Sequence, residues 1–267
     1  RNWRILTLVA TDCNFVSVFL GIETPDVESL ELTRKHQNNR GSMADAVRKI
    51  QRRGMRVMAG FIIGFDGEKP GAGDRIWQFI EQTNVTHGMT SMLQVLPNTG
   101  LYTRLTKEGR LHAGGLNAMN QTEILNFVPT RPSSEIAREY LDSIAKIYDP
   151  VNYMSRAYRY VMELGLDRPE PYKGGPADVP GAKAPITFQD VKNELRMYVV
   201  AVRLIWRQGV ARSSRKVFWK HAWSVWRKRP EHFGHFLTLC AHNEHFLELT
   251  DYTTRLMEAQ IPHLSDE

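Results

Sequence analysis

The pattern of apolar and polar positions divides the chain into an alternating part and a helical part. In roughly the first hundred residues, short apolar runs alternate with segments whose apolar residues recur at helical spacing. The runs, which we predict to be buried strands, cover 17–22, 56–63 and 89–96. The helices predicted between and after them cover 42–53, 74–83 and 101–108. Buried strands separated by amphipathic helices indicate a parallel sheet, either doubly wound or part of a βα barrel.

The second half of the chain has a helical pattern throughout. We predict helices at 133–149, 151–164, 187–208, 213–229 and 231–249, with a final piece reaching Gln260. Nine glycines and prolines among the 22 residues from Gly165 to Ile186 indicate a linker. The expected organisation is an α/β region at 1–127, a helical connection at 128–164, the linker at 165–186 and a helical domain at 187–267. The predicted fold class is therefore α/β followed by all-α.

Composition excludes several classes of protein. With 42% hydrophobic and 24% charged residues, the chain has an ordinary globular composition rather than a disordered or collagenous one. Its two cysteines, Cys13 and Cys240, lack the spacing of a zinc site or a cysteine-ligated cluster. A cysteine content this low is typical of proteins in the reducing cytoplasm. The sequence contains neither an apolar run of about 18 residues nor a signal-peptide pattern. We expect a cytoplasmic protein that can associate with a membrane surface.

The positive charge is concentrated in one segment. The net charge is +6, yet the residues from Leu195 to Pro230 include ten basic and no acidic side chains. The aromatic residues interspersed among these cations are Tyr198, Trp206, Phe218, Trp219, Trp223 and Trp226. Residues 196–229 therefore fit peripheral contact with an anionic membrane. A partner protein, an ordinary helical bundle with solvated cations, and a nucleic acid remain alternatives, and the nucleic acid is the least favoured of the partners.

Four histidines lie close together in the last predicted helices: His232, His235, His242 and His245. The last three fall within about 80° of one another on a helical wheel. However, their spacing is not that of the zinc-protease motif, and His235 and His245 are almost three turns apart. We therefore assign no metal to them.

The ends of the three predicted strands are the expected place for a ligand, because parallel α/β proteins bind ligands there. Glu23 follows the first strand, and glycines at 60, 64 and 67 allow a ligand to approach the second. Their spacing matches neither the dinucleotide fingerprint nor the P-loop, so a nucleotide phosphate site is unsupported. The purely structural alternatives are a carboxylate at a helix start for Glu23 and a tight turn for the glycines.

Three segments in this order resemble the radical SAM superfamily. They are VFLGIETP at 18–25, QRRGMRVMAGFIIGFDGE at 51–68, and LPNTGLYTRL at 96–105, and the similarity continues through LNFVP at 125–129 and YDP at 148–150. The chain is most similar to the subgroup with an N-terminal cobalamin-binding domain, which is related to the hopanoid methylases. The resemblance covers nearly the whole chain, including the helical C-terminal region.

The resemblance implies a six-stranded, TIM-like βα barrel, of which this chain holds the second half followed by a helical C-terminal domain. By this resemblance, Glu23 contacts the ribose or the amino-acid part of S-adenosylmethionine. Ile62 and Gly64 match the motif that flanks adenine. Pro97 matches the end of the sixth strand, where Asn98 departs from the glycine that is usual in the family.

The family also uses a four-iron cluster, held by a three-cysteine motif, and cobalamin; the resemblance places both outside this chain. In the intact enzyme, the cluster cleaves S-adenosylmethionine, the resulting radical abstracts a substrate hydrogen, and methylcobalamin delivers the methyl group. Because the sequence starts at Arg1 and its first methionine is Met43, we expect an inactive fragment of a methyltransferase that acts on a lipid-like or other small substrate. The alternative is a non-catalytic α/β-plus-helical module that binds a membrane surface or a partner protein.

Overall fold

A computed structural model describes residues 15–26, 43–112, 125–168 and 199–263. Its strands are β1 (Ser17–Glu23), β2 (Arg56–Ile63) and β3 (His87–Met92). Its α-helices are α3 (Met43–Arg52), α4 (Ala72–Thr83), α5 (Gly100–Lys107), α6 (Ser133–Tyr148), α7 (Pro150–Glu163), α9 (Arg215–Lys228) and α10 (Phe233–Gln260). Residues 199–206 are helical and lead into the π-helical turn η4 (Arg207–Ala211). The 3₁₀ turns η5 (Pro230–His232) and η6 (Ile261–His263) flank α10.

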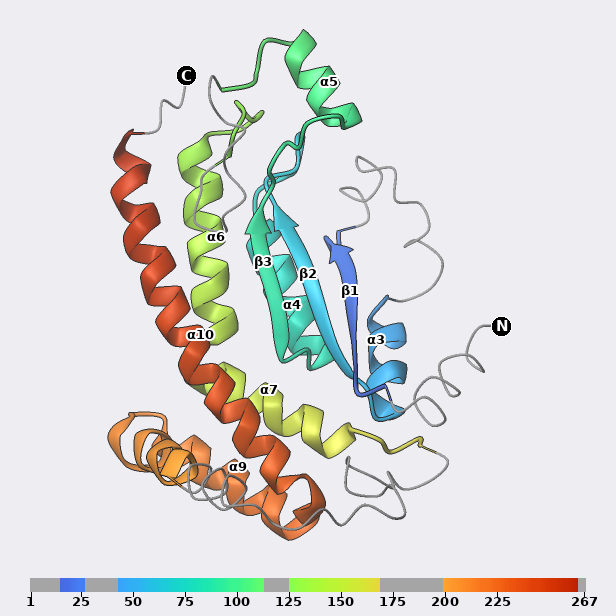
Figure 1. The fold of residues 1–267 in the computed structure, drawn as a ribbon, viewed down its shortest axis with the longest axis vertical. Coiled ribbons are helices and arrows are strands. Elements are labelled where there is room, and N and C mark those ends of the chain that lie inside the picture. Colours follow the sequence, from blue (N-terminus) through green and yellow to red (C-terminus); the bar gives the residue numbers. More distant parts are fainter. Residues whose placement is uncertain (1–14, 27–42, 113–124, 169–198, 264–267) are drawn as a thin grey trace, which may run out of the picture.

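The three strands form one parallel sheet in the order β1-β2-β3 (Figure 1), which confirms the predicted parallel pairing. The third strand lies earlier than the predicted range of 89–96, because it begins at His87 and ends at Met92. His87 and Gly88 interrupt the apolar pattern, yet they are in register with residues of β2. Backbone pairing with a neighbouring strand, rather than side-chain hydrophobicity, therefore sets the start of β3.

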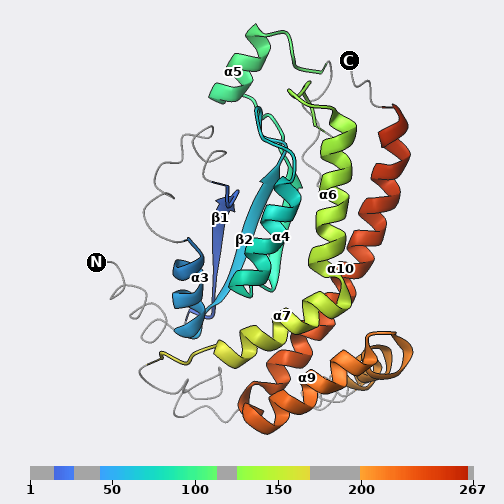
Figure 2. The ribbon, with the colours of Figure 1, turned by 180° about the vertical axis from the view of Figure 1, so that it is seen from behind.

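The two faces of the sheet have different surroundings, as the alternating burial along β2 shows. The buried side chains are Val57, Ala59, Phe61 and Ile63, and the partly buried positions between them are Arg56, Met58, Gly60 and Ile62. Helices α3 and α4 cover the first face (Figure 2). The second face is turned toward the viewer in Figure 1, and no described helix lies over its centre. The apolar core therefore forms on one side of the sheet.

Helix α6 packs closely on α4 at Gly73. A Cβ atom on Gly73 would lie 2.8 Å from the carbonyl oxygen of Glu139 and 3.0 Å from the Cβ of Ser143. Only glycine allows the two helices to approach this closely. Helix α10 packs in turn on α6 and α7, so the C-terminal helices are continuous with the layer that covers the sheet.

A sharp corner between α6 and α7 joins the sheet to the C-terminal helices. The Tyr148 hydroxyl donates a hydrogen bond to the Gly88 carbonyl of β3 (2.8 Å). Asn243 of α10 donates to the Tyr148 carbonyl (3.0 Å). The Asp149 carboxylate accepts hydrogen bonds from the first turn of α7, which caps that helix. The corner therefore connects β3, α6, α7 and α10.

Arg156 lies inside this corner, and its side chain is completely buried. Its guanidinium donates hydrogen bonds to the Glu81 carboxylate of α4 and to the Ile147 carbonyl of α6, the latter at 2.6 Å. The same carboxylate forms an ion pair with Arg159 (2.6 Å), which lies one turn further along α7. Because a buried charge is stable only when it is paired and hydrogen-bonded, the cation fixes α7 against α4 and α6.

Helix α10 is continuous over 28 residues, so the predicted helix end at Leu249 is wrong. The polar, β-branched residues that follow Leu249 weaken the helical pattern in the sequence. In the structure, however, the Thr250 hydroxyl donates to the Phe246 carbonyl one turn earlier (2.8 Å). Thr253 and Met257 are buried. Tertiary packing therefore extends the helix through a segment of low intrinsic propensity.

The expected linker at 165–186 and the start of the helix at 187–208 lie mostly outside the described residues, as does Cys13. The first linker residues are held against α3, because the Asp167 carboxylate pairs with Arg52 (2.7 Å). In the part of the chain that the structure describes, no helix is both long and apolar enough to cross a bilayer.

We expect Arg156→Ala to lower the free energy of unfolding by about 3 kcal/mol or more, because it removes a buried cation with its hydrogen bonds and leaves a cavity. Urea unfolding followed by circular dichroism measures this change. Arg159→Ala is the matched control: its side chain is 41% exposed, so a loss of about 1 kcal/mol or less is expected. Equal losses in the two variants would contradict the structural role assigned to Arg156.

Candidate functional site

The four site residues predicted from the sequence all follow or end strands on the carboxyl side of the sheet. Glu23 is the last residue of β1, Ile62 is the penultimate residue of β2, and Gly64 comes directly after β2. Pro97 is exposed and lies in the connection from β3 to α5. Because the strands are parallel and in register, these residues lie at one edge of the sheet, the upper edge in Figure 1.

Glu23 is held by an irregular end of β1. The pairing register with β2 shifts between Gly21 and Glu23, and Glu23 has a φ of 66°. A Cβ atom on Gly21 would lie 2.9 Å from Oε1 of Glu23, so the carboxylate folds back over Gly21. Gly21 pairs with Gly60, which belongs to the uncovered face of the sheet. The bulge therefore directs the Glu23 carboxylate toward that face.

Ile62 lies on the same uncovered face, opposite Ser91 of β3, and apolar side chains lie further along this face. Phe19 of β1 is 53% exposed and Met89 of β3 is 41% exposed, although both belong to central positions of their strands. The ring of Phe19 lies over Gly60, where a Cβ atom would be 3.0 Å from Cζ. The face thus has the Glu23 carboxylate at the carboxyl end of the strands and exposed apolar side chains further along. This combination suits an organic ligand that has a polar and an apolar part.

The turn after β2 depends on Gly64 and Glu68. Gly64 has a φ of 93°, which an L-residue with a side chain rarely adopts. Its N–H donates a hydrogen bond to the Glu68 carboxylate (2.7 Å). Glu68 is 4% exposed, and burial raises its pKa to about 7 in spite of this hydrogen bond. Gly64 therefore serves the backbone of a tight turn, whether or not it also contacts a ligand.

Asp66 joins the same turn to the elements beyond β3. Its side chain, 7% exposed, pairs with Arg110 (2.6 Å) and with Arg104 of α5 (2.7 Å). Burial acts to raise the pKa of Asp66, but the two guanidinium groups hold it below its usual value. This role of Asp66 was not predicted from the sequence, because its partners lie 38 and 44 residues away along the chain.

The segment that carries Pro97 is positioned by its neighbours. Asn126 accepts a hydrogen bond from the Val95 N–H (2.9 Å) and donates one to the Val95 carbonyl (3.0 Å), as a neighbouring strand would. Asn98 has a φ of 63°, a conformation that asparagine tolerates better than most other residues. Thr99 then caps α5 by accepting a hydrogen bond from the Tyr102 N–H (3.2 Å). Asn98 thus keeps the backbone geometry that a glycine would give.

The cysteines and histidines do not form a metal site in the described residues. No group of three or more metal-ligating side chains occurs there. Cys240 is buried within α10, and burial raises the pKa of its thiol. His242 instead contacts His87 of β3, with 3.1 Å between a ring nitrogen of each side chain. Burial, and to a smaller extent the positive charge of Arg56, lowers the pKa of His87 to about 3. The contact of His87 was not predicted from the sequence, because a single histidine beside a glycine forms no recognisable pattern.

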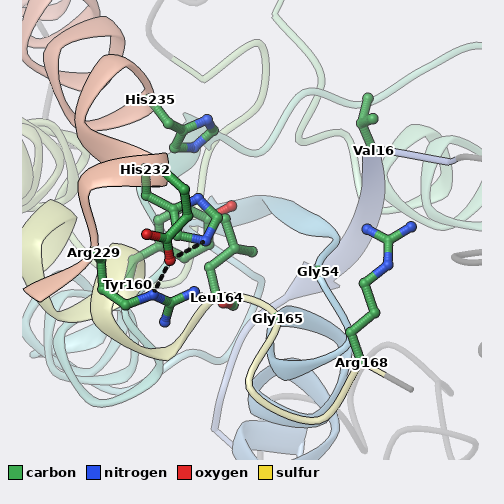
Figure 3. A pocket seen from close by; sticks show the side chains of 10 residues that line it. Val16, Gly54, Tyr160, Leu164, Gly165, Arg168, Arg229, His232 and His235 are labelled. Carbon is green, nitrogen blue, oxygen red and sulfur yellow. Dashed lines mark hydrogen bonds and ion pairs between the residues drawn. The ribbon is translucent and has the colours of Figure 1, made fainter. Parts of the chain in front are cut away.

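A cavity of about 630 Å³ lies at the opposite, amino end of the sheet (Figure 3). Val16 and Arg168 line one side, and His232, His235 and Tyr160 line the other. Burial lowers the pKa of His235 to about 4, so its imidazole is neutral at pH 7. Since parallel α/β proteins bind their ligands at the carboxyl ends of strands, the sheet edge with Glu23 remains the candidate site.

A parallel sheet with one uncovered face and a carboxylate at the carboxyl end of its strands is the arrangement in which α/β proteins commonly bind ligands. The chain belongs to the family that carries the domain of unknown function DUF4070, whose model matches residues 99–259.

Two relatives carry names that describe a methyl-transfer activity. An uncharacterized methyltransferase of Synechocystis sp. (strain ATCC 27184 / PCC 6803 / Kazusa) is 46% identical over 250 residues, which cover 94% of this chain and 44% of the relative. The hopanoid C-2 methylase of Rhodopseudomonas palustris (strain TIE-1) is 29% identical over 213 residues, which cover 78% of this chain and 36% of the relative. The chain thus spans less than half the length of each relative. No solved structure matches it. These matches confirm the relationship to the hopanoid methylases of the radical SAM superfamily.

We expect Glu68→Gln to change how stability depends on pH. Because the folded protein holds the Glu68 proton more tightly than the unfolded chain does, stability contributed by this group is present below pH 4.5 and falls as the pH rises to about 7. The variant should therefore be more stable than the wild type at pH 8, by about 3 kcal/mol, and similar at pH 4. Urea unfolding at both pH values measures this difference. Glu258→Gln, at an exposed position, is the control, and the same pH dependence in both variants would contradict the assignment.

Proposed function

We propose that this chain forms the S-adenosylmethionine-binding and substrate-facing part of a radical SAM methylase, which transfers a methyl group to an unactivated carbon. The observation that carries the proposal is the uncovered apolar face of the sheet with the Glu23 carboxylate at its carboxyl edge. The names of the two relatives support methyl transfer as the class of reaction. They favour this proposal over a non-catalytic module.

The residues at the sheet edge fit S-adenosylmethionine. The Glu23 carboxylate can accept hydrogen bonds from ribose hydroxyls or from the amino group of the methionine part. Ile62 lies on the same face and offers a half-buried apolar surface to the adenine ring. The turn that Gly64 begins lets the chain pass close to the ring. When bound, S-adenosylmethionine would supply the radical precursor of the reaction.

The sheet favours a barrel that is completed by strands outside the described residues. Among those residues, β1 has a neighbouring strand on one side only, so it is an edge strand beside which a further strand can pair. The uncovered face also leaves Phe19 and Met89 about half exposed. Additional parallel strands that continue from β1 would pair the edge and enclose this face. The three strands would then be the later half of a TIM-like barrel.

The described residues do not fit an iron–sulfur cluster. Such a cluster needs several thiolates close together, whereas Cys240 is buried in α10 and the whole sequence contains one other cysteine. We propose that the ligands of the cluster, and the domain that binds cobalamin, belong to other parts of a longer protein. The contribution of this chain is to hold S-adenosylmethionine and to enclose the substrate.

A lipid-like substrate agrees with the chemistry of the uncovered face. Phe19, Met58, Ile62 and Met89 give this face flexible and aromatic apolar side chains, with the Glu23 carboxylate near the strand ends. Such a surface gains free energy by removing hydrocarbon from water, at roughly 25 cal/mol per Å². The relative from Rhodopseudomonas palustris is named for methylation of a hopanoid, which is consistent with a substrate of this kind.

A chimeric protein tests the proposal directly. This chain replaces the matching stretch of the Synechocystis relative, and the purified, anaerobically reconstituted protein is assayed for release of 5′-deoxyadenosine from S-adenosylmethionine. We expect release in the chimera. We also expect Glu23→Gln to raise the KM for S-adenosylmethionine by about tenfold or more, because a hydrogen bond to a charged acceptor is lost.

Glu258→Gln serves as the matched control, because it removes the same charge at an exposed position of α10, and its KM should not change. A chimera that folds and binds its cluster but releases no 5′-deoxyadenosine, while the unaltered relative does, would refute the proposal. An unchanged KM in the Glu23→Gln chimera would refute the assignment of Glu23 alone.

A further inference from the structure

The basic segment exposes an unusual number of tryptophans. Trp206, which comes just before η4, is 63% exposed, and the three tryptophans of α9 are at least half exposed: Trp219 at 50%, Trp223 at 59% and Trp226 at 52%. Tryptophan is normally largely buried. Val202 and Val210, near Trp206 in the sequence, are exposed as well. Together these residues form the exposed aromatic surface considered below, which lies around α9 at the lower end of the molecule in Figure 1.

Helix α9 separates this surface from its buried side. Phe218, Ala222 and Val225 are buried against the rest of the protein. Around the helix axis, at 100° per residue, Trp219, Trp223 and Trp226 fall within about 60° of one another, on a different side of α9 from these buried residues. The rings of Trp223 and Trp226 contact each other, with centroids 5.1 Å apart. The three indoles therefore lie on one stripe of α9, in which Trp223 and Trp226 contact each other and Trp219 packs on Gly209 of η4, donating a hydrogen bond to its carbonyl (2.9 Å).

The cations next to the stripe form no ion pairs with acidic side chains among the described residues. Arg207 and Arg212 pair with Glu244, and Arg229 pairs with Glu231, so these three stabilise the fold. Within residues 199–229, the exposed cations that form no ion pair with described residues are Arg203, Arg215, Lys216, Lys220, Arg227 and Lys228. Lys216, Lys220 and Arg227 directly adjoin the tryptophan stripe on the wheel of α9. Their charge is available to an external anion.

We propose that this face of α9, together with residues 202–210, is a docking surface for a bilayer that contains anionic lipids. Indole rings are favoured at the depth of lipid headgroups, and adjacent lysines and arginines attract acidic lipids. Charge complementarity selects this partner. A second copy of the chain would bring the same cations together without any acidic residue between 195 and 230 to pair with them. The contact is peripheral, because no described helix is long and apolar enough to span a bilayer.

This surface is separate from the strand ends, so the inference does not depend on binding of S-adenosylmethionine. Vesicle sedimentation of the full 267-residue chain tests it, with phosphatidylcholine vesicles that contain either no phosphatidylserine or about 30% of it. We expect at least about tenfold stronger partitioning onto the anionic vesicles at about 0.1 M salt. A blue shift of tryptophan fluorescence should accompany binding, because the exposed indoles leave water.

Two variants separate the apolar and ionic parts of the surface. Trp223→Ala with Trp226→Ala should weaken partitioning by about tenfold through lost burial of indole. The triple variant Lys216→Gln, Lys220→Gln and Arg227→Gln should weaken it by at least about tenfold, since each cation contributes about fivefold. The matched control, Lys107→Gln, Arg138→Gln and Arg255→Gln, removes the same charge from exposed positions elsewhere and should bind nearly as well as the wild type.

Several results would overturn the inference. One is failure of the folded chain to bind anionic vesicles, and another is an equal loss in the two triple variants, which indicates non-specific attraction. A dimer in analytical ultracentrifugation that Trp223→Ala with Trp226→Ala converts to a monomer would assign the surface to self-association. Binding to single-stranded RNA that depends on these tryptophans, in a chain that ignores vesicles, would assign it to a nucleic acid.

Discussion

The fold depends on the buried guanidinium of Arg156. A charge without access to water must keep every partner it has, and here the partners belong to different elements: a carboxylate on α4 and a backbone carbonyl at the end of α6. The cation therefore fixes the angle between α6 and α7. Tyr148 and Asn243 use the same corner to attach β3 and α10. The position of the C-terminal helices relative to the sheet follows from this one set of contacts.

A fixed helical layer on one side leaves the other side of the sheet available for binding. The covered face holds the buried side chains of the core. The open face holds Phe19, Met58, Ile62 and Met89, whose side chains are only partly buried or exposed. Core packing and exposed apolar surface are thus assigned to alternate residues of the same strands. At the strand ends, Asp66 and Asn126 hold the connecting segments with side-chain hydrogen bonds, so the edge that carries Glu23 is rigid on its β2 and β3 sides.

The sequence predicted what depends on local pattern and missed what depends on distant contacts. Strand β2 was predicted with the bounds it has, because its eight residues form a bounded apolar run. Helices α6 and α7 followed from their periodicity, to within about a residue. The start of β3 at His87, the continuity of α10 past Thr250 and the partners of Asp66 were missed, because each depends on residues far away in the chain. Asn98 looked like a departure from its family pattern until its backbone angle was known.

The continuity of α10 has a consequence for how the chain can vary in evolution. Over its 28 residues this helix contacts the α6–α7 corner through Asn243 and the segment around η4 through Glu244, and it buries Met257 in the apolar core. Insertion of a single residue would rotate everything beyond it by about 100°, and these contacts would no longer face their partners together. Substitutions can accumulate along the exposed side of α10, but its length between Asn243 and Met257 is constrained to remain constant.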